Sequence, residues 1–261
     1  MIAFCTHCSD DWFFDGGCSK LLSTAKHFHP DIPFFVFGSF ELNLLAKKYP
    51  GLTWDTLNPI VSKEVAQDFD KVVHFDADSI ILGSLNEILE FDADVLTVRN
   101  NNDFNTASRY TDPPITVNNC APENYMNAGL IASKNRLFWD DWISCNKFAH
   151  SYPYKEQDTL NILLQSGKYN HKCLDPKDSS NHYGISCHYG EKSFWDSSRD
   201  IMYKNGKFVL KDKVIKVYHQ AGGHQHFPKL QLRTLFNEET AKEIERISSR
   251  PVAYHKRTIY V

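Results

Sequence analysis

Short apolar runs alternate with helix-like segments over the first hundred residues, and this alternation is the strongest constraint on the fold. Runs rich in β-branched and aromatic residues indicate strands, and apolar residues at helical spacing indicate helices. The predicted strands are Ile2–Thr6, Pro33–Gly38, Leu52–Asp55, Lys71–Phe75 and Asp94–Arg99, and the predicted helices are Gly17–Phe28, Glu41–Tyr49 and Ser62–Phe69. Strands that alternate with helices predict an α/β fold with a mostly parallel sheet and helices on its faces.

The second half of the chain is less regular. Asn100–Tyr125 has no periodicity and is predicted to be a long loop, which in a compact domain is usually functional or disordered. Leu174–Asp200 is predicted to be irregular. Strands are predicted at Gly129–Ser133 and Lys213–His219, and helices at Asn135–Ala149, Glu156–Gln165 and Leu230–Ser249. We expect one domain of residues 1–228 and a C-terminal helical extension of residues 229–261 packed on it.

Composition limits the classes of function. A net charge of −3 over 261 residues argues against a nucleic-acid-binding protein, for which a basic footprint is expected. Neither a secretory leader pattern nor an apolar run of transmembrane length is visible, so we expect a cytoplasmic protein. The seven cysteines are odd in number and irregularly spaced, which favours reduced thiols.

The tail from residue 229 holds seven Lys/Arg and four Asp/Glu, a net charge of +3. A basic, partly apolar segment of this kind can lie against an anionic membrane, so a peripheral membrane contact is one interpretation. Packing of a C-terminal helix on its own domain is the simpler interpretation.

Two carboxylates interrupt an apolar run in K-V-V-H-F-D-A-D-S-I-I-L-G, residues 71–83. Asp76 and Asp78 are two apart on an extended chain, so their side chains point to the same face. Two like charges held together and partly buried raise each other's pKa unless a cation neutralises them. A hard divalent cation with oxygen ligands is the natural partner.

The residues alone suggest four candidate roles for this D-x-D, one of which they exclude. The simplest is that both carboxylates cap the following turn. An EF-hand is excluded because Ile81 stands where that loop needs glycine. A dehalogenase-type phosphatase also uses D-x-D after an apolar strand, as nucleophile and acid/base, although usually after the first strand. The fourth is a transferase in which the pair holds a metal against a nucleotide diphosphate.

The wider context resembles glycosyltransferase family eight, the group of glycogenin and the bacterial lipooligosaccharide galactosyltransferases. S-K-E-V-A-Q-D-F-D-K-V-V-H-F-D-A-D at residues 62–78 matches the family's D-x-D segment, with His74 where tyrosine is usual. Y-M-N-A-G-L at 125–130, E-Q-D-T-L-N at 156–161 and V-Y-H-Q-A-G at 217–222 follow in the family's order. The resemblance runs from Ile2 to about Phe227 and implies the GT-A fold, a Rossmann-like mixed sheet flanked by helices.

The resemblance implies a metal-dependent glycosyltransferase. It would move a sugar from a UDP-sugar donor to a hydroxyl of a glycan or glycoconjugate acceptor, with retention of configuration. Asp76, Asp78 and His219 would bind the metal, and an imidazole among carboxylates favours Mn²⁺ over Mg²⁺. The implied donor-binding residues are Thr6, His7, Cys8, Asp10, Lys63, Asp76, Ala77, Asp78, Gly222 and Gln225.

The residues expected to act on the sugar are Asn127, Glu156 and Gln157, with Glu156 orienting the sugar hydroxyls. Two positions depart from the family pattern: Glu156 replaces an aspartate, and Gln225-His226-Phe227 replaces a K-P-W that carries the diphosphate lysine. His224 and His226 are candidate substitutes for that lysine. A D-x-D phosphatase and a non-catalytic sugar-binding protein with the same fold remain the alternatives. Cys5-x-x-Cys8 also leaves a redox or zinc site open.

Overall fold

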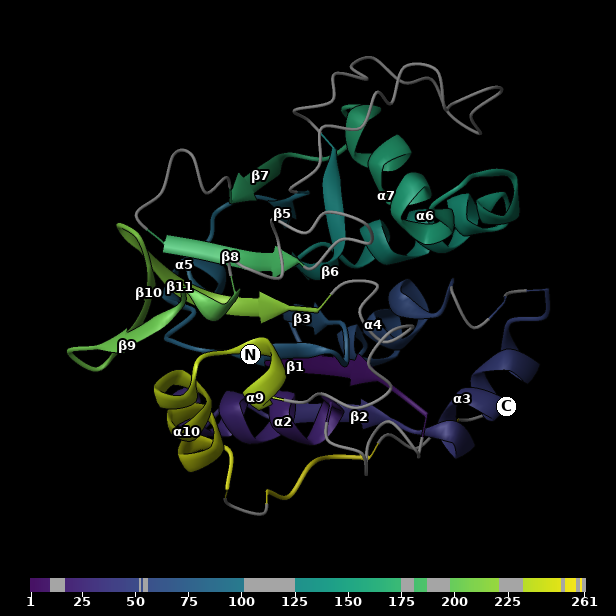
Figure 1. The fold of residues 1–261 in the computed structure, drawn as a ribbon. Helices are drawn as coiled ribbons and strands as arrows, with labels where there is room; N and C mark the ends of the chain where they lie inside the picture. Colours follow the sequence, from purple (N-terminus) through teal and green to yellow (C-terminus); the bar gives the residue numbers. More distant parts are fainter. Residues whose placement is uncertain are drawn as a thin grey trace.

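The computed structural model places a central sheet between helices, with a second, smaller sheet at one end (Figure 1). The structure describes residues 1–9, 17–51, 53, 56–100, 125–174, 181–186, 198–220, 232–249, 252–256 and 259, with the backbone alone for 182–186. The predicted strand Leu52–Asp55 and the predicted loop therefore fall largely outside the described residues.

The central sheet has six strands in the order β2-β1-β3-β6-β5-β7. Their bounds are β1 Ile2–His7, β2 Phe34–Phe37, β3 Lys71–Phe75, β5 Val95–Arg99, β6 Met126–Ser133 and β7 His171–Leu174. β1 pairs in parallel with β2 and β3, and β5 with β7, whereas β6 runs antiparallel to both of its neighbours. The prediction of a mixed, mostly parallel sheet in an α/β fold is confirmed.

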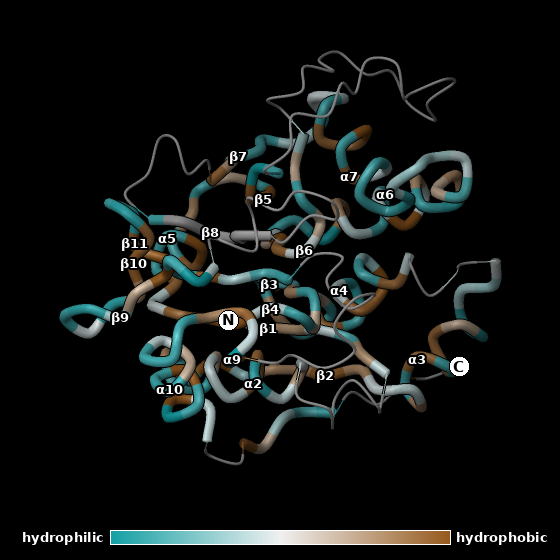
Figure 2. Tube along the Cα trace, in the orientation of Figure 1, coloured by the Kyte–Doolittle hydropathy of each residue, from teal (hydrophilic) through white to brown (hydrophobic). Residues whose placement is uncertain are grey.

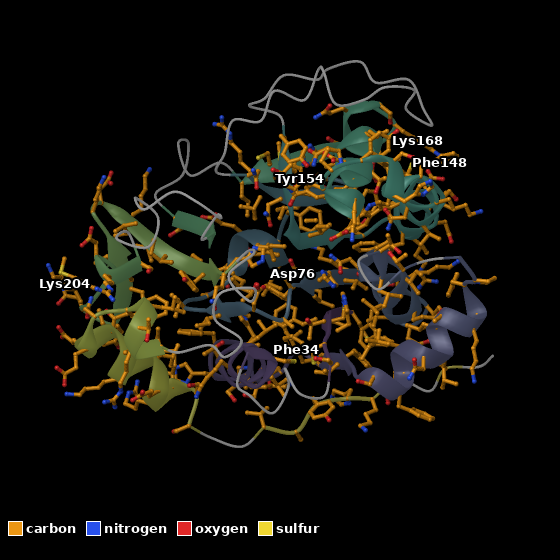
Figure 3. The ribbon with its side chains drawn as sticks, turned by 45° about the vertical axis from the view of Figure 1, so that its right-hand side comes forward. Phe34, Asp76, Phe148, Tyr154, Lys168 and Lys204 are labelled. Atoms are coloured by element: carbon orange, nitrogen blue, oxygen red, sulfur yellow. The ribbon has the colours of Figure 1, made fainter. Side chains whose placement is uncertain are left out.

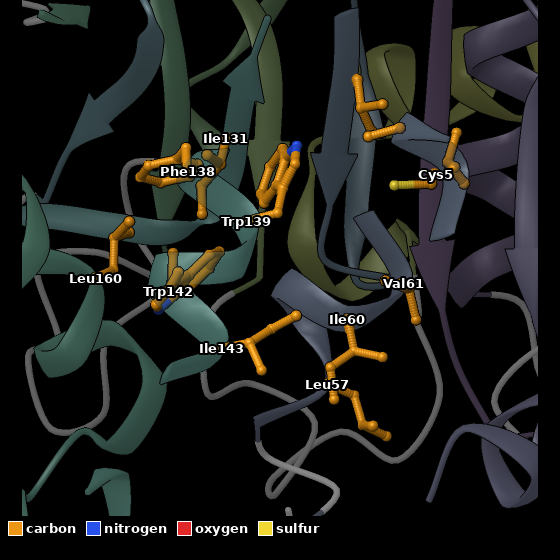
Figure 4. Packing of buried hydrophobic residues seen from close by; sticks show 14 of the residues in the cluster. Cys5, Leu57, Ile60, Val61, Ile131, Phe138, Trp139, Trp142, Ile143 and Leu160 are labelled. Carbon is orange, nitrogen blue, oxygen red and sulfur yellow. The ribbon is translucent and has the colours of Figure 1, made fainter. Parts of the chain in front are cut away.

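Helices bury both faces of this sheet. On one face, α4 (Asn58–Ala66) and α6 (Arg136–Asn146) share a core cluster that includes Trp139, Trp142 and Cys5 (Figure 4). The other face packs against α2 (Gly17–Phe28), through Cys18, Leu21 and Leu22. β1 and β2 are mostly brown, hence apolar, in Figure 2, as expected for strands that are buried on both sides.

The described part of the chain contains further helices beside these. They are α3 (Ser39–Lys48), α5 (Asn86–Leu89), the 3₁₀ helix η3 (Ala149–Ser151) and α7 (Lys155–Gln165). The predicted helix Ser62–Phe69 begins earlier, at Asn58, because Pro59 is tolerated in the first turn, where its missing N–H is not needed. The helix predicted at Asn135–Ala149 ends at Asn146.

A second sheet was not predicted. It contains β4 (Ser79–Ile81), β9 (Met202–Lys204), β10 (Lys207–Leu210) and β11 (Lys213–His219), with β8 (Asn181–Ser186) also paired to β11. The prediction that Leu174–Asp200 is irregular is therefore wrong for β8. β4 follows the D-x-D directly and runs antiparallel to the end of β11, and this pairing brings two distant segments together.

The single tail helix predicted at Leu230–Ser249 is two helices, α9 (Leu232–Leu235) and α10 (Glu238–Ile247). Asn237 separates them because its side chain caps α10 by accepting a hydrogen bond from Thr240 N–H. Apolar residues of both helices pack with Ile80 and Tyr218 of the second sheet and with Leu82, which follows β4. Beyond them the chain returns to the edge of β2, where His255 bridges Phe35.

The domain boundary and the membrane contact were also predicted from the sequence. The proposed domain boundary at residue 228 lies outside the described residues. Among the helices that the structure describes, none combines the length and the apolar character needed to cross a bilayer. The predicted peripheral membrane contact stays a prediction.

Candidate functional site

Three candidate metal ligands meet at the carboxyl end of β3. Asp76 and Asp78 follow that strand directly, and His219 is the last residue of β11, opposite Ser79 of β4. The antiparallel β4–β11 pair thus carries the histidine back to the carboxylates, with Gln220 N–H donating to the Asp78 carbonyl at 3.2 Å. One ligand atom from each of the three side chains lies within 4.8 Å of the others. Asp76 lies near the middle of the molecule (Figure 3).

The contacts within this triad are ion-pair contacts rather than hydrogen bonds. His219 Nε2 lies 3.2 Å from Asp76 Oδ2 and 3.1 Å from Asp78 Oδ1. It nevertheless has no partner of hydrogen-bonding geometry among the described residues, although it is buried. An imidazole nitrogen and carboxylate oxygens that converge without bonding to one another suit a divalent cation between them. The triad therefore fits the metal site that the sequence predicted.

The charges of the triad depend on one another. Burial favours a neutral His219, but the carboxylates of Asp78 and Asp76 outweigh burial and raise the pKa of His219 to about 10. Burial also opposes ionisation of Asp76, and the histidine outweighs it, so the pKa of Asp76 falls to about 2. Without a cation the imidazolium neutralises the acidic pair. A metal ion that binds here must displace that proton, because only neutral imidazole is a ligand.

Gly129 of β6 makes room for His219. A Cβ at this position would lie 2.1 Å from His219 Cε1 and 2.5 Å from Nδ1, closer than atoms can approach. The Gly129 carbonyl also accepts a hydrogen bond from Asp76 N–H at 2.9 Å. Gly129 thus helps to position both a carboxylate and the histidine. These contacts explain why a glycine stands at this place in the Y-M-N-A-G-L segment.

Buried polar atoms without hydrogen-bond partners gather around the triad. Among the described residues they include Thr6 Oγ1, both ring nitrogens of His74, Ser79 Oγ and both amide atoms of Gln220. His74 and Ser79 flank the D-x-D, Gln220 follows His219, and Thr6 lies near the end of the neighbouring β1. Folded proteins leave few such atoms unpaired, so their concentration at one place indicates a site for a polar ligand or ordered water.

Three amide side chains, Asn127, Gln157 and Asn161, join α7 to β6 next to Gly129, and we call them the amide wall. Gln157, in the first turn of α7, accepts hydrogen bonds at Oε1 from Asn127 Nδ2 (3.2 Å) and Ala128 N–H (3.1 Å). One turn later, Asn161 bonds both backbone groups of Met126. The i, i+4 spacing puts both amides on one face of α7, where they attach the helix to β6. The structure thus brings Asn127 and Gln157 together, as the sequence suggested.

Glu156 is the first acidic residue of α7. Burial, with the negative charge of Asp76 also contributing, raises the pKa of Glu156 to about 8. The carboxyl group is therefore protonated at neutral pH in the absence of a metal, and it can then donate a hydrogen bond as well as accept one.

The structure places the other predicted donor-binding residues in differing surroundings. Thr6 is buried, and His7 stacks loosely on His74, with ring centroids 5.8 Å apart. Cys8 and Ala77 pack with the apolar cluster beneath α2. Lys63 does not join the triad: its Nζ lies 2.5 Å from Asp140 on α6, so a role at the diphosphate would require this ion pair to open. Asp10, Gly222 and Gln225 lie outside the described residues, as do His224 and His226.

The Cys5-x-x-Cys8 alternative is not supported by the geometry. Cys5 packs on the α4 side of the sheet, with its Sγ 3.8 Å from Ser62 Oγ, whereas Cys8 packs on the α2 side. Burial raises the pKa of the Cys5 thiol to about 12, which disfavours the thiolate that metal binding needs. The described cysteines, namely Cys5, Cys8, Cys18, Cys145 and Cys173, are free thiols.

Three contributors to the site were missed by sequence reasoning. Asn100, at the end of β5, accepts a hydrogen bond from Asn127 at 3.2 Å. Asn58, the first residue of α4, donates to Asp76 Oδ1 at 3.4 Å. Gly129 belongs to the Y-M-N-A-G-L segment of the resemblance, but no role was assigned to it there. Asn58-Pro59 is a helix-start signal that could have placed Asn58 beside the sheet, but nothing local marks Asn100.

Comparison with known proteins identifies the fold. No protein-family model matches the chain, and no curated protein matches it in sequence. Solved structures do match. The structure of galactosyltransferase LgtC in complex with donor and acceptor sugar analogues superposes with a TM-score of 0.51 and 14% identity, covering 95% of both chains. An active-site mutant of LgtC gives 0.52 and 13%.

The bifunctional glycosyltransferase WbbM also matches, with a TM-score of 0.53 and 15% identity over 95% of this chain. The chain spans about half, 52%, of the WbbM chain. This protein has a GT-A fold. The predicted fold is thereby confirmed, and the Asp76-Asp78-His219 triad lies at the carboxyl end of the central sheet, where ligands of such α/β sheets bind.

Proposed function

We propose that this protein is a metal-dependent glycosyltransferase that uses a UDP-sugar donor and a hydroxyl of a glycan or glycoconjugate as acceptor. The observation that carries the proposal is the convergence of Asp76, Asp78 and the orphaned His219 Nε2 at the carboxyl end of a GT-A sheet. The likeness to LgtC, whose structure holds donor and acceptor sugar analogues, supports the same assignment.

A divalent cation, Mn²⁺ or Mg²⁺, would be held by the triad and would stabilise the departing diphosphate as a Lewis acid. Residues of the protein would position the metal ligands and the donor. Gly129 and Asn58 fix Asp76, and the β4–β11 pair fixes His219. The unpartnered groups of Thr6 and Gln220 are available to polar groups of the donor, and the amide wall faces its sugar. Fixed donors of this kind need no reorganisation when charge develops.

Glu156 has a separate role in this scheme. Protonated at neutral pH before the metal binds, it would bind sugar hydroxyls without adding a further negative charge near the diphosphate. A cation on Asp76 would remove the repulsion that helps to raise its pKa, so ionisation of Glu156 would accompany loading of the site. Retention of anomeric configuration is part of the proposal and can be read from the anomeric proton of the product.

A thermal-shift panel tests the donor class. UDP-, GDP- and CDP-sugars are each added with and without Mn²⁺, and with EDTA as the control. Ligand at 100 times its Kd adds about 2.7 kcal/mol to the free energy of unfolding, which for a chain of this size raises Tm by roughly 5–10 °C. We expect this rise with UDP-sugars and Mn²⁺ together. The absence of a metal-dependent shift with every nucleotide sugar would contradict the proposal.

Turnover separates the proposal from its alternatives. Mn²⁺-dependent release of UDP from a UDP-sugar is expected, and it increases when the correct acceptor is present. Release of phosphate from a phosphomonoester, with no action on nucleotide sugars, would identify a D-x-D phosphatase instead. Binding of a UDP-sugar without any turnover would identify a sugar-binding protein with this fold.

A further inference from the structure

The amide network beside the triad fixes which end of Gln157 is available to a ligand. Gly129 N–H lies 2.8 Å from Asn127 Oδ1, and because a backbone N–H can only donate, this contact sets the orientation of the Asn127 amide. Asn127 Nδ2 therefore faces the other way, where it donates to Asn100 Oδ1 and Gln157 Oε1, each at 3.2 Å. Both amide hydrogens and the oxygen of Asn127 are thus used within the protein.

The orientation of the Gln157 amide is fixed in the same way. Its Oε1 accepts two hydrogen bonds, from Asn127 Nδ2 and from Ala128 N–H, and the second donor again allows only one orientation. A carbonyl oxygen has two lone pairs, so both are engaged. The Nε2 group then points away from β6 and makes no hydrogen bond within the described part of the chain. Gln157 is half-buried, and its Nε2 is not among the buried side-chain atoms without partners, so this group is not fully enclosed.

We propose that Gln157 acts on the donor sugar as a hydrogen-bond donor through Nε2, and that Asn127, supported by Asn100, is the positioning residue that holds it in this orientation. The proposal rests on the function proposed above and revises the expectation that Asn127 itself contacts the sugar. It also disfavours Gln157 Oε1 as the atom that attacks the sugar, because that oxygen already accepts two hydrogen bonds.

Asn127 also connects the two halves of the site. Its Oδ1 binds Gly129 N–H, and the Gly129 carbonyl in turn accepts from Asp76 N–H. A change at Asn127 would therefore be transmitted to Gln157 on one side and to the backbone that carries a metal ligand on the other. A small displacement of a positioned group can reduce a rate by up to about 100-fold.

A double-mutant cycle on Mn²⁺-dependent UDP-sugar turnover tests the positioning role. Asn127→Asp retains the acceptor for Gly129 N–H but cannot donate to Gln157. We expect kcat to fall between about 10- and 100-fold with little change in KM for the donor. In a Gln157→Ala background the same substitution should have no further effect. Multiplicative losses in the double variant would overturn the proposal, because Asn127 would then act independently of Gln157.

Asn146→Asp provides the matched control. Asn146 is also buried and doubly bonded, to the Thr56 carbonyl and Thr159, but it belongs to the α6–α7 contact outside the site. Its effect on kcat should be the same in the wild-type and the Gln157→Ala backgrounds. A folding defect common to buried asparagines would appear in both cycles, whereas coupling confined to the Asn127 cycle identifies positioning.

A second measurement does not need activity. The side-chain NH₂ resonances of Gln157 can be assigned in ¹⁵N spectra by their loss in Gln157→Glu. Asn127→Asp should shift them, because Oε1 loses a donor, and Asn146→Asp should not. Unshifted resonances would overturn the orientation assigned here, whatever the enzyme does. If they shift while the wild type turns over no UDP-sugar, the network stands and the proposed function fails.

Discussion

The candidate site has two sides: the acidic wall, which is the triad with its neighbours His74 and Ser79, and the amide wall. They differ in how many of their polar groups have hydrogen-bond partners. On the acidic wall, His219 Nε2, His74 and Ser79 have buried atoms without hydrogen-bond partners in the described part of the chain. On the amide wall, Asn127, the oxygen of Gln157 and both ends of Asn161 are bonded within the protein. Unsatisfied groups cost stability and are completed by a ligand, whereas satisfied groups are rigid before the ligand arrives. We therefore expect the acidic wall to gain most from binding a ligand and the amide wall to be rigid beforehand.

The largest effect is expected from removing a ligand on the acidic wall. Asp78→Asn should lower Mn²⁺ affinity, and with it UDP-sugar turnover, by more than about 100-fold, which exceeds the usual cost of losing an outer-shell partner. Titration of Mn²⁺ and initial rates of UDP release measure the effect. The apo variant loses one of the two ion-pair partners of His219, so its urea unfolding is measured as a control for folding. Unchanged turnover would rule out the metal assignment.

Gly129→Ala should disturb both walls at once. The new methyl group would collide with the His219 ring, so we expect the metal affinity to fall and the free energy of unfolding to drop by about 1–3 kcal/mol, as for other overpacked sites. Urea unfolding of the apo protein measures the second effect. In a His219→Ala background the collision disappears, so Gly129→Ala should then cost much less. An equal cost in both backgrounds would contradict this explanation.

On the amide wall, substitution should cost stability rather than metal binding. Asn161→Ala leaves the N–H and the carbonyl of Met126 buried without partners, and we expect a loss of about 1–3 kcal/mol in the free energy of unfolding. Mn²⁺ affinity, measured well below the unfolding transition, should be nearly unchanged. A large loss of metal affinity would show that the walls are not separable in this way.

The last comparison concerns the pH dependence of stability. The folded pKa of Glu156, about 8, lies above the ordinary value near 4.5, so the unfolded state loses this proton first as pH rises. The contribution of Glu156 to stability is therefore complete below about pH 4.5 and is lost progressively up to about pH 8. Glu156→Gln, which resembles the protonated form, should flatten stability between about pH 5 and pH 8. Parallel profiles for variant and wild type in urea unfolding would contradict the assignment.

The sequence predicted the acidic wall better than the amide wall. β3 and β11 were predicted with their observed bounds because long β-branched runs are strong local signals, and the D-x-D and His219 end those runs. β4 was missed because three residues are too few to show a period, although its pairing with β11 brings His219 to the carboxylates. Asn100 was missed because its partner is 27 residues away in the chain.

The same contrast holds for the rest of the fold. The central strands are buried on both faces and are recognisable from composition alone. β7 begins with His171, whose ring lies 2.7 Å from Thr97 Oγ1, and such a polar edge strand looks like a loop in the sequence. β8 and β10 pair with β11, and β9 pairs with β10, so these segments depend on partners elsewhere in the second sheet. Local patterns therefore predict elements with their own core, and they fail where pairing with a distant partner decides the structure.

The antiparallel pairing of β4 with β11 has a consequence for biosynthesis. The ribosome makes the D-x-D early and His219 more than half a chain length later, so a nascent chain carries an exposed acidic pair without its imidazole. The metal site can close only once β11 has emerged and added itself to β4. Only chains whose synthesis has passed β11 could then bind a metal through all three ligands.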